Sequence, residues 1–295
     1  MMKAEKFNCA TPRSDGFILV AVLWMLGLLS AVVSIYAIFV IDSAKGLPFY
    51  DERLQADALV LAALELTAYR QLNTVTQSRP TQGQFSFRLG GANVAVEFRS
   101  EVARIDLNAA PKPLLAGLFI ALGARPDDAE MYSDRVVSWR TSPSAGEKLS
   151  PPGRSYIGYR QREGRFPHPY ELTLLPGLPP ALAQRALRFV TVYNGRPQVN
   201  VRDAAPEVLA ALPGMSEKRV SAVLMQRQTA PRNGESLLQL LGASQQYATL
   251  EGNNALRVRV NITFDNGRRA NSEVVILVFE AGDEPFSIFS WRDEL

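Results

Sequence analysis

The feature that most constrains this chain is an uncharged, mostly apolar run from Phe17 to Ile41, which begins directly after a short polar leader. At about 1.5 Å per residue, a helix of this length crosses the roughly 30 Å hydrocarbon core of a bilayer. A secretory signal peptide differs, because its apolar core is shorter and precedes a small-residue cleavage site. We therefore expect the run to stay in the membrane as a helix.

The junction at the start of this run is the pair Gly16-Phe17. A cut after Gly16 would leave Phe17 as the first residue of the membrane helix. An ordinary signal anchor, in which the Gly-Phe pair is accidental, gives the same topology. The basic residues Lys3, Lys6 and Arg13 precede the helix in either case. They predict a cytoplasmic N-terminus, with the rest of the chain across the membrane.

Composition narrows the possible chemistry. The formal net charge of +3 over 295 residues gives little reason to expect nucleic acid. Cys9, in the leader, is the single cysteine, so stability must come from packing. His168 is the single histidine, which excludes multi-histidine metal sites and leaves one residue for any Ser-His-Asp catalysis. It lies in the proline-stiffened segment Phe166–Tyr170, which predicts an extended loop and a structural or solvated histidine.

After the membrane run, the pattern from Asp51 to Leu72 is helical. Apolar residues at three- and four-residue spacing predict an amphipathic helix that packs this stripe on a sheet. The residues of the predicted stripe are Leu54, Ala58, Leu61, Leu64, Ala68 and Leu72.

Strand patterns flank the middle of the chain on both sides. Alternating residues and turn signals at Gly90-Gly91 and Asp265-Asn266-Gly267 predict hairpins. The predicted strands are Phe85–Leu89, Asn93–Arg99, Leu256–Phe264, Ser272–Phe279 and Phe286–Trp291. The middle, from about Ile105 to Asn253, has helical patterns. The sequence thus predicts an α+β fold in which one sheet is built from both ends and a helical region is inserted between them.

Two elements recur within this helical middle. In Asn108–Pro111 and Asp203–Pro206, the Asn or Asp is expected to cap a helix whose first turn contains Pro. In Leu175–Leu178 and Leu212–Met215, a Pro-Gly pair predicts a tight turn with positive φ at Gly. Helices are expected to follow over residues 181–190 and 217–227. This is the sequence pattern of a helix-hairpin-helix.

A helix-hairpin-helix can bind a nucleic-acid phosphate through backbone N–H groups at the start of its second helix. Pro179 removes one such donor from the first copy, and Ser216 could cap the helix in the second copy. Lys218, Arg219 and Arg227 could contact phosphate, or they could form a solvated helix face. Because positive charge is not concentrated here, we favour a packing module for protein contacts.

One acidic cluster is a candidate cation site: Asp127, Asp128, Glu130 and Asp134. Calcium needs several oxygens that converge from a loop. These residues instead begin a predicted helix, where acidic groups interact favourably with the helix dipole. We therefore assign no metal, cofactor or catalytic residue. Nothing in the sequence resembles a phosphate-cradling loop, an acid/base pair or a thiol nucleophile, so an enzyme is not predicted.

The order of these features resembles the K-type minor pseudopilins of the type II (general) secretion system, over nearly the whole chain. The segments that carry the resemblance are Gly16-Phe17, Val22-Leu23-Trp24, Ser100–Asn108, Tyr170–Gly177, Val199–Pro206 and the strand pair after Leu256. The resemblance implies a type IV pilin-like fold, in which a long N-terminal helix packs on an antiparallel sheet. It also implies a large inserted helical domain with helix-hairpin-helix or SAM-like repeats.

The resemblance further implies a division of the chain. The expected parts are a cleaved leader (1–16), a transmembrane helix (17–41), a pilin-like helix with first strands (42–104), the inserted helical region (105–253) and the C-terminal strands (254–295). A prepilin peptidase would cut between Gly16 and Phe17, and Phe17 would be N-methylated. The protein would cross the bacterial inner membrane once, with most of the chain in the periplasm.

The function implied is that of a subunit at the tip of the pseudopilus, supporting export of folded proteins across the outer membrane. Its partners would be other minor pseudopilins, with no nucleic acid and no small-molecule substrate. Most pilins carry Glu where this chain has Ala21, and the K-type subunit lacks it as well. Family members often have an Asp-rich loop where this chain reads Ser138–Ser144, so the calcium site of the family is not carried over. The alternative is a membrane-tethered helix-hairpin-helix DNA receptor of the competence type.

The junction gives a first testable prediction. Replacing Gly16 by a bulky residue such as Leu is expected to leave the precursor uncut, because the peptidase must accommodate this position next to the scissile bond. Intact-mass measurement after expression with a prepilin peptidase should show Phe17 as the methylated first residue of the unsubstituted chain. Cleavage beyond Ala21, or an uncut unsubstituted chain beside an active peptidase, contradicts the prepilin interpretation.

Overall fold

The computed structural model describes residues 15–74, 79–141, 164–230 and 234–294. The chain divides into two compact units, residues 1–58 and 59–295. Helix α1 (Asp15–Leu72) contributes to both units. Within the first unit, Leu19–Val40 is long and apolar enough to cross a membrane, with a mean hydropathy of 2.3, and its side chains are exposed. This finding agrees with the predicted membrane helix.

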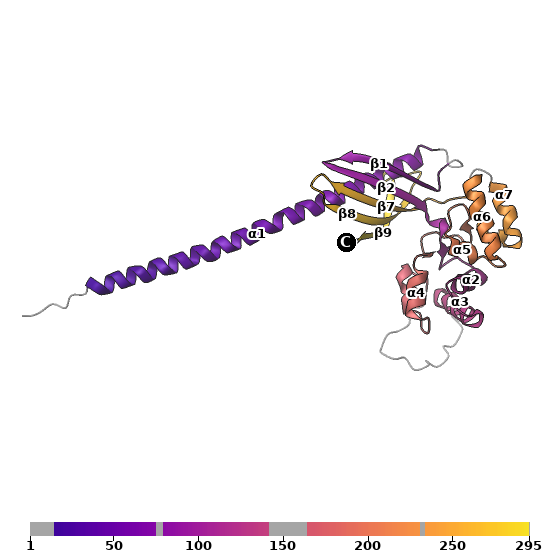
Figure 1. Cartoon of the computed structure of the whole chain (residues 1–295), viewed down its shortest axis with the longest axis horizontal. Helices are drawn as coiled ribbons and strands as arrows, with labels where there is room; N and C mark the ends of the chain where they lie inside the picture. Colours follow the sequence, from indigo (N-terminus) through magenta and orange to yellow (C-terminus); the bar gives the residue numbers. More distant parts are fainter. Residues whose placement is uncertain (1–14, 75–78, 142–163, 231–233, 295) are drawn as a thin grey trace, which may run out of the picture. The chain divides into compact units, whose positions relative to one another are not determined.

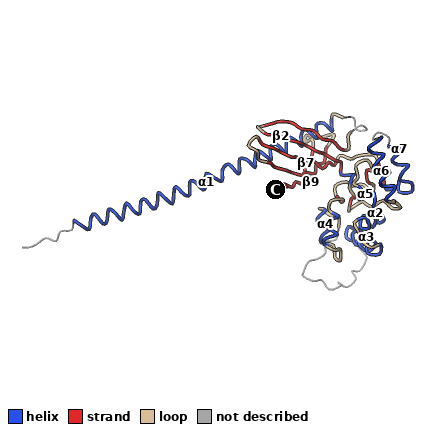
Figure 2. Tube along the Cα trace, viewed as in Figure 1, coloured by secondary structure: helices blue, strands red, loops and turns tan. Residues whose placement is uncertain are grey.

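The second unit contains a five-stranded antiparallel sheet with the strand order β1-β2-β7-β8-β9. All five predicted strands are present (Figures 1 and 2). Their bounds are β1 (Gln82–Leu89), β2 (Ala92–Ser100), β7 (Ala255–Phe264), β8 (Arg269–Val278) and β9 (Phe286–Glu294). The positive φ of Gly90, Gly91 and Gly267 provides the two predicted turns. Because β2 pairs with β7, the sheet is completed by strands from the end of the chain.

The last turns of α1 pack against this sheet. The Arg70 guanidinium lies 4.0 Å from the centre of the Phe85 ring on β1. Alternate strand residues such as Val96 and Val258 are buried on the inner face of the sheet. The buried helix residues follow two lines of four-residue spacing: Leu59, Ala63, Thr67 and Gln71, and Val60, Leu64 and Ala68.

The predicted apolar stripe of this helix was partly wrong. Leu64 and Ala68 are buried, but Leu54 is 69% exposed and Leu61 is 42% exposed. The prediction counted apolar residues only, whereas two polar residues lie on the buried face. Thr67 donates to the carbonyl of Ala63 and Gln71 donates to the carbonyl of Pro80, so their burial leaves these groups hydrogen-bonded.

Between β2 and β7 the structure contains six α-helices and short strands within the described residues, and Figure 1 shows these helices grouped together. The helices are α2 (Lys112–Ala121), α3 (Pro126–Arg140), α4 (Pro180–Ala186), α5 (Pro206–Ala210), α6 (Glu217–Thr229) and α7 (Gly234–Leu241). The 3₁₀ turns are η2 (Glu101–Ala103), η3 (Pro169–Leu174) and η4 (Gly242–Tyr247). Two short parallel ladders pair β3 (Ile105–Asp106) with β4 (Val190–Thr191), and β5 (Val199–Asn200) with β6 (Ala248–Thr249).

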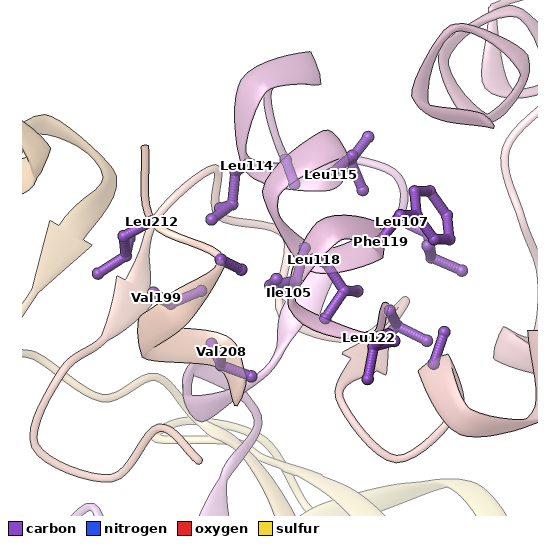
Figure 3. Close-up of a cluster of buried hydrophobic side chains, with 14 of the residues drawn as sticks. Ile105, Leu107, Leu114, Leu115, Leu118, Phe119, Leu122, Val199, Val208 and Leu212 are labelled. Carbon is purple, nitrogen blue, oxygen red and sulfur yellow. The ribbon is translucent and has the colours of Figure 1, made fainter. Parts of the chain in front are cut away.

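A single hydrophobic core joins the two copies of the repeat. Figure 3 shows Ile105, Leu114 and Leu118 from the first copy beside Val199 and Val208 from the second. All five side chains are fully or almost fully buried. Each copy thus completes the apolar contacts of the other.

The predicted Pro-Gly turns are present in both copies. Gly177 has φ of 74° and Gly214 has φ of 79°. The amide of Leu178 donates to the carbonyl of Leu175 at 3.2 Å, and that of Met215 donates to Leu212 at 3.1 Å. These i to i+3 bonds, with Gly in the third position, are typical of type II turns.

The predicted helix caps were wrong. The residue before α2 is Pro111 and the residue before α5 is Ala205, and neither makes a side-chain cap. The side chain of Asn108 instead bonds the backbone of Phe166, and Asp203 accepts from Asn200. Earlier residues, Asp106 and Asn200, bond the backbone of each turn. In the structure Asp106 therefore corresponds to Asn200, and Pro111 to Ala205, which differs by one residue from the sequence match of Asn108 with Asp203. Both Asp106 and Asn200 form Asx turns, in which the side chain accepts from a backbone amide before the helix starts.

Helices α2 and α5 approach closely at Gly117. A Cβ atom added at Gly117 would overlap the backbone carbonyl of Ala211. A backbone carbonyl cannot rotate away as a flexible side chain can. The close contact therefore requires glycine, although Gly117 lies inside a helix where alanine is intrinsically favoured.

Gly117→Ala tests this packing. Helix propensity alone would stabilise the variant by about 1 kcal/mol. The steric overlap is expected to outweigh this gain and to lower the free energy of unfolding by about 1–3 kcal/mol. Chemical denaturation followed by circular dichroism measures the difference. Ser138→Ala, on the exposed side of α3, is the matched control and should change stability by less than about 0.5 kcal/mol. A Gly117→Ala variant as stable as this control contradicts the close approach.

Candidate functional site

The predicted processing junction lies at the start of helix α1. Gly16 and Phe17 belong to the first turn of α1, which begins at Asp15. The leader through Ser14, including Cys9, lies outside the described residues. Cleavage between Gly16 and Phe17 therefore remains a prediction. Ala21 lies within the apolar span.

The three basic residues of the second predicted helix-hairpin-helix copy differ in exposure and in hydrogen bonding. Lys218 and Arg219 are exposed on the first turn of α6. Ser216 caps this helix by accepting from the amide of Arg219, as the sequence allowed. Arg227 faces inward, where it donates to the carbonyl of Val201 at 2.7 Å and to that of Ala204 at 2.8 Å. It is therefore committed to holding the loop before α5, and no joint phosphate site forms from the three basic residues.

The acidic cluster agrees with the helix-start interpretation. Asp127 and Asp128 lie in the first turn of α3. Asp134, two turns further on, pairs with Lys112 at 2.8 Å. Among the residues that the structure describes, no group of three or more His, Cys, Asp or Glu side chains could hold a metal ion.

His168 has a structural role. It precedes η3 in an extended conformation, and its Nδ1 accepts from the amide of Tyr170 at 3.2 Å. Its ring stacks on that of Tyr170. Burial, with the charges of Arg257 and Arg292, lowers the pKa of His168, which favours the neutral ring that this acceptor needs. The predicted extended loop was partly wrong, because Pro169 and Tyr170 already belong to η3.

A charged cluster on the outer face of the sheet was missed by the sequence analysis. Arg257 on β7 donates to Glu101 at 2.7 Å and to Glu273 on β8 at 2.6 Å. Arg259 and Arg292 also donate to Glu273, at 3.0 and 2.9 Å. The two glutamates are nearly inaccessible, with side chains only 1% and 5% exposed. The cluster therefore combines three positive charges with two buried negative charges.

The sequence indicates this cluster only when the charged residues of paired strands are compared. The strand register places Glu97 opposite Arg259, Arg259 opposite Glu273, and Glu273 opposite Arg292. Charges thus alternate in sign across four neighbouring strands. Single-strand periodicity assigned these residues to an exposed face, because it does not include the pairing partner.

The electrostatics of the cluster favour its charged state. Burial alone would raise the pKa of Glu273, but the charge of Arg257 and hydrogen bonds from Arg259 and Arg257 lower it to about 2. Burial also opposes the charge on Arg257, yet Glu101 and Glu273 outweigh it and raise the pKa of Arg257. Arg104 lies nearby, and burial together with the charge of Arg257 lowers its pKa to about 10. Positive charge is therefore in excess here.

A groove of about 1060 Å³ opens over this cluster. One wall is the outer face of the sheet, with Arg259 and Arg292. The opposite wall comes from η3 and α4, with Tyr170 and Arg185. The Arg292 guanidinium links the two walls by donating to the Tyr170 hydroxyl at 2.8 Å.

Comparison with known proteins gives one informative result. No family model matches the chain, and no curated protein matches it. Among solved structures, a match is a chain from "The Crystal Structure of the GspK-GspI-GspJ complex from enterotoxigenic Escherichia coli Type 2 Secretion System". The TM-score is 0.56, and the match covers 85% of this chain and 99% of that chain. The two chains share a fold. Because their identity is 18%, the likeness concerns architecture, and it supports the mixed α/β fold with an N-terminal helix and an antiparallel sheet.

The buried cluster predicts a pH-dependent loss of stability. Glu273→Gln is expected to lower the free energy of unfolding at neutral pH by about 3–5 kcal/mol, because it leaves arginine charges facing each other. The pKa of Glu273 is depressed in the folded state, so its stabilising effect is complete above the ordinary value of 4.5 and is lost as pH falls toward about 2. The difference between variant and unsubstituted chain should therefore shrink over this window, which denaturation curves at several pH values measure.

Glu97→Gln is the matched control. Glu97 lies on the same face, but its contact with Arg99 is 3.7 Å long and both side chains are about half exposed. Its loss should cost less than about 1 kcal/mol. Equal effects of the two substitutions would contradict a stabilising role for the buried cluster.

Proposed function

We propose that this chain is a minor pseudopilin of the type II secretion system, of the K type. The observation that carries the proposal is the fold shared with a chain of the GspK-GspI-GspJ complex, over nearly all of that chain. The order of sequence motifs supports the same assignment independently, because these motifs are a property of the residues and not of the architecture. The role is assembly of a short fibre that supports export of folded proteins, with no catalysis.

The membrane segment supports an anchored subunit. The span Leu19–Val40 would hold the protein in the inner membrane, with the basic leader in the cytoplasm. Cleavage after Gly16 and methylation of Phe17 by a prepilin peptidase would prepare it for extraction. The sheet and helices would then lie in the periplasm.

Two features support a position at the fibre tip. Ala21 provides no carboxylate to pair with the terminal amine of another subunit, and an unpaired carboxylate would be costly in the membrane. We also propose that the helices between β2 and β7 form an inserted domain built from helix-hairpin-helix repeats. Such an insertion would obstruct the stacking of identical copies, which is compatible with a terminal subunit.

The alternative of a tethered DNA receptor is less well supported. It would need basic groups that converge at a hairpin, whereas Arg227 is committed to backbone carbonyls. Pro179 has no N–H group to donate at the start of the first hairpin's second helix. The shared fold of the GspK-GspI-GspJ chain also favours the pseudopilin proposal.

The other minor pseudopilins would contact the exposed side of the last turns of α1. Leu61, Glu65 and Tyr69 follow one another at four-residue spacing there, and all three are exposed. Leu61 is 42% exposed and Tyr69 is 64% exposed. Apolar side chains on one side of a helix are suited to helix-to-helix docking.

Paired substitutions on this helix test the proposal. Leu61→Asp is expected to weaken the complex with other minor pseudopilins at least about tenfold, which corresponds to 1.4 kcal/mol, while the fold is kept. Leu64→Asp places a charge at a fully buried position and is expected to disrupt the fold itself. Co-purification measures the complex, and circular dichroism measures the fold.

Self-association provides the second arm of this test. The chain alone should remain monomeric in detergent micelles and should form a defined hetero-complex when mixed with the other minor pseudopilins. Long fibres of this chain alone would overturn the tip assignment. An unaltered complex with Leu61→Asp would overturn the proposed contact side.

A further inference from the structure

Positively charged side chains outnumber negatively charged ones in the lining of the groove over the charged cluster. Six of its lining residues are arginines and two are glutamates. Glu101 lies beneath and adds one more negative charge. Since the buried glutamates are already bonded to Arg257 and its neighbours, an excess of positive charge faces the groove. This excess favours an anionic ligand.

Two of the arginines are available to a ligand. Arg185 lies in the last turn of α4, Arg188 lies in the turn that follows the helix, and both side chains are exposed. No hydrogen bond or ion pair joins either side chain to another residue of the described ranges. Because Leu187 between them keeps α-helical backbone angles, the two residues are spaced as on a helical turn, where side chains three apart are neighbours and their charges reinforce each other. Holding two like charges together is unfavourable unless an anion binds between or beside them.

Aromatic side chains also line the groove. Tyr170 and His168 form one stacked pair, and Tyr193 and Trp291 lie on the sheet side. Arginine, tyrosine and tryptophan are the residues that are enriched at protein-binding surfaces, where they bury large areas at low entropic cost. The volume of about 1060 Å³ lies just above the usual range of about 300–1,000 Å³ for small-molecule pockets, so the groove is larger than a single small anion needs.

We propose that this groove binds an acidic polypeptide segment of another protein. Its carboxylates would pair with Arg185, Arg188 and the outer arginines of the sheet, and its apolar parts would lie on the aromatic side chains. On the sheet side, the guanidinium groups of Arg257, Arg259 and Arg292 already hold the carboxylate of Glu273 at 2.6–3.0 Å, which shows that this wall can bind a carboxylate. Nucleic acid fits less well, because its backbone requires a longer basic surface than one groove. The inference rests on the groove alone and does not depend on the pseudopilin proposal.

The test uses the full chain in detergent micelles and a fluorescein-labelled hexaglutamate peptide with a tyrosine at each end. Fluorescence anisotropy should show saturable binding at low salt. The corresponding hexaglutamine peptide should not bind. Arg185→Glu with Arg188→Glu is expected to weaken hexaglutamate binding at least about tenfold.

The matched control reverses the same number of charges elsewhere. Lys218→Glu with Arg219→Glu changes two exposed basic residues on α6, and neither lines the groove. This control should bind hexaglutamate as the unsubstituted chain does. Arg188→Gln, which removes one charge without reversal, should weaken binding by a smaller factor. This single variant keeps the test decisive if circular dichroism shows that the double variant is misfolded.

Four outcomes would overturn the proposal. The first is no saturable binding of hexaglutamate. The second is equal loss in the groove variant and in the α6 control, which would indicate general attraction to a basic protein. The third is equal binding of hexaglutamine, which would show that carboxylates are not recognised. The fourth is tighter, groove-dependent binding of a single-stranded oligonucleotide of equal charge, which would make the groove a nucleic-acid site.

Discussion

The ion cluster around Arg257 is the interaction on which the second compact unit depends. Arg257 belongs to β7, and its guanidinium holds Glu101, in the turn that leaves β2, and Glu273 on β8. Glu101 also accepts from the hydroxyl of Thr191, which lies on β4. A single side chain thus connects the sheet to the start of the helical middle. Buried ion pairs add little net stability compared with apolar packing, but the loss of one partner is costly because the other charge remains buried. The cluster therefore fixes the geometry at this junction.

Packing in the helical middle depends on small residues as much as on large ones. The core shared by the two copies requires α2 and α5 to approach until Gly117 meets the carbonyl of Ala211. Leu114 and Leu118 on α2 can then reach Val208 on α5 (Figure 3). The core depends on both copies, since short helices such as α5 bury too little surface to be stable alone.

Much of the fold was predictable because its signals are local. Apolar strand patterns and turn signals predicted all five strands, and Gly90-Gly91 and Gly177 predicted turns, since strand patterns and positive φ are properties of neighbouring residues. The errors came from pairing between distant residues. Thr67 and Gln71 are buried because carbonyls accept from them, and Asp106 replaces the expected helix caps by bonding a turn. The groove was not predictable for the same reason, because Arg188 and Arg259 come together only when α4 faces the sheet. No single segment contains that information.

The pairing of β2 with β7 has a consequence for the order in which the chain can fold. These neighbours in the sheet are separated in sequence by the entire helical middle. During synthesis β2 is made long before β7, so one edge of β2 is unpaired until β7 has been made. The helical middle has its own hydrophobic core and can fold during this interval. An unpaired strand edge is a site for wrong pairing with other chains. The charges that alternate along the outer face of β2, at Glu97 and Arg99, would limit such pairing during this interval. We therefore expect pairing of the last strands with β2 to be the slow, final step of folding.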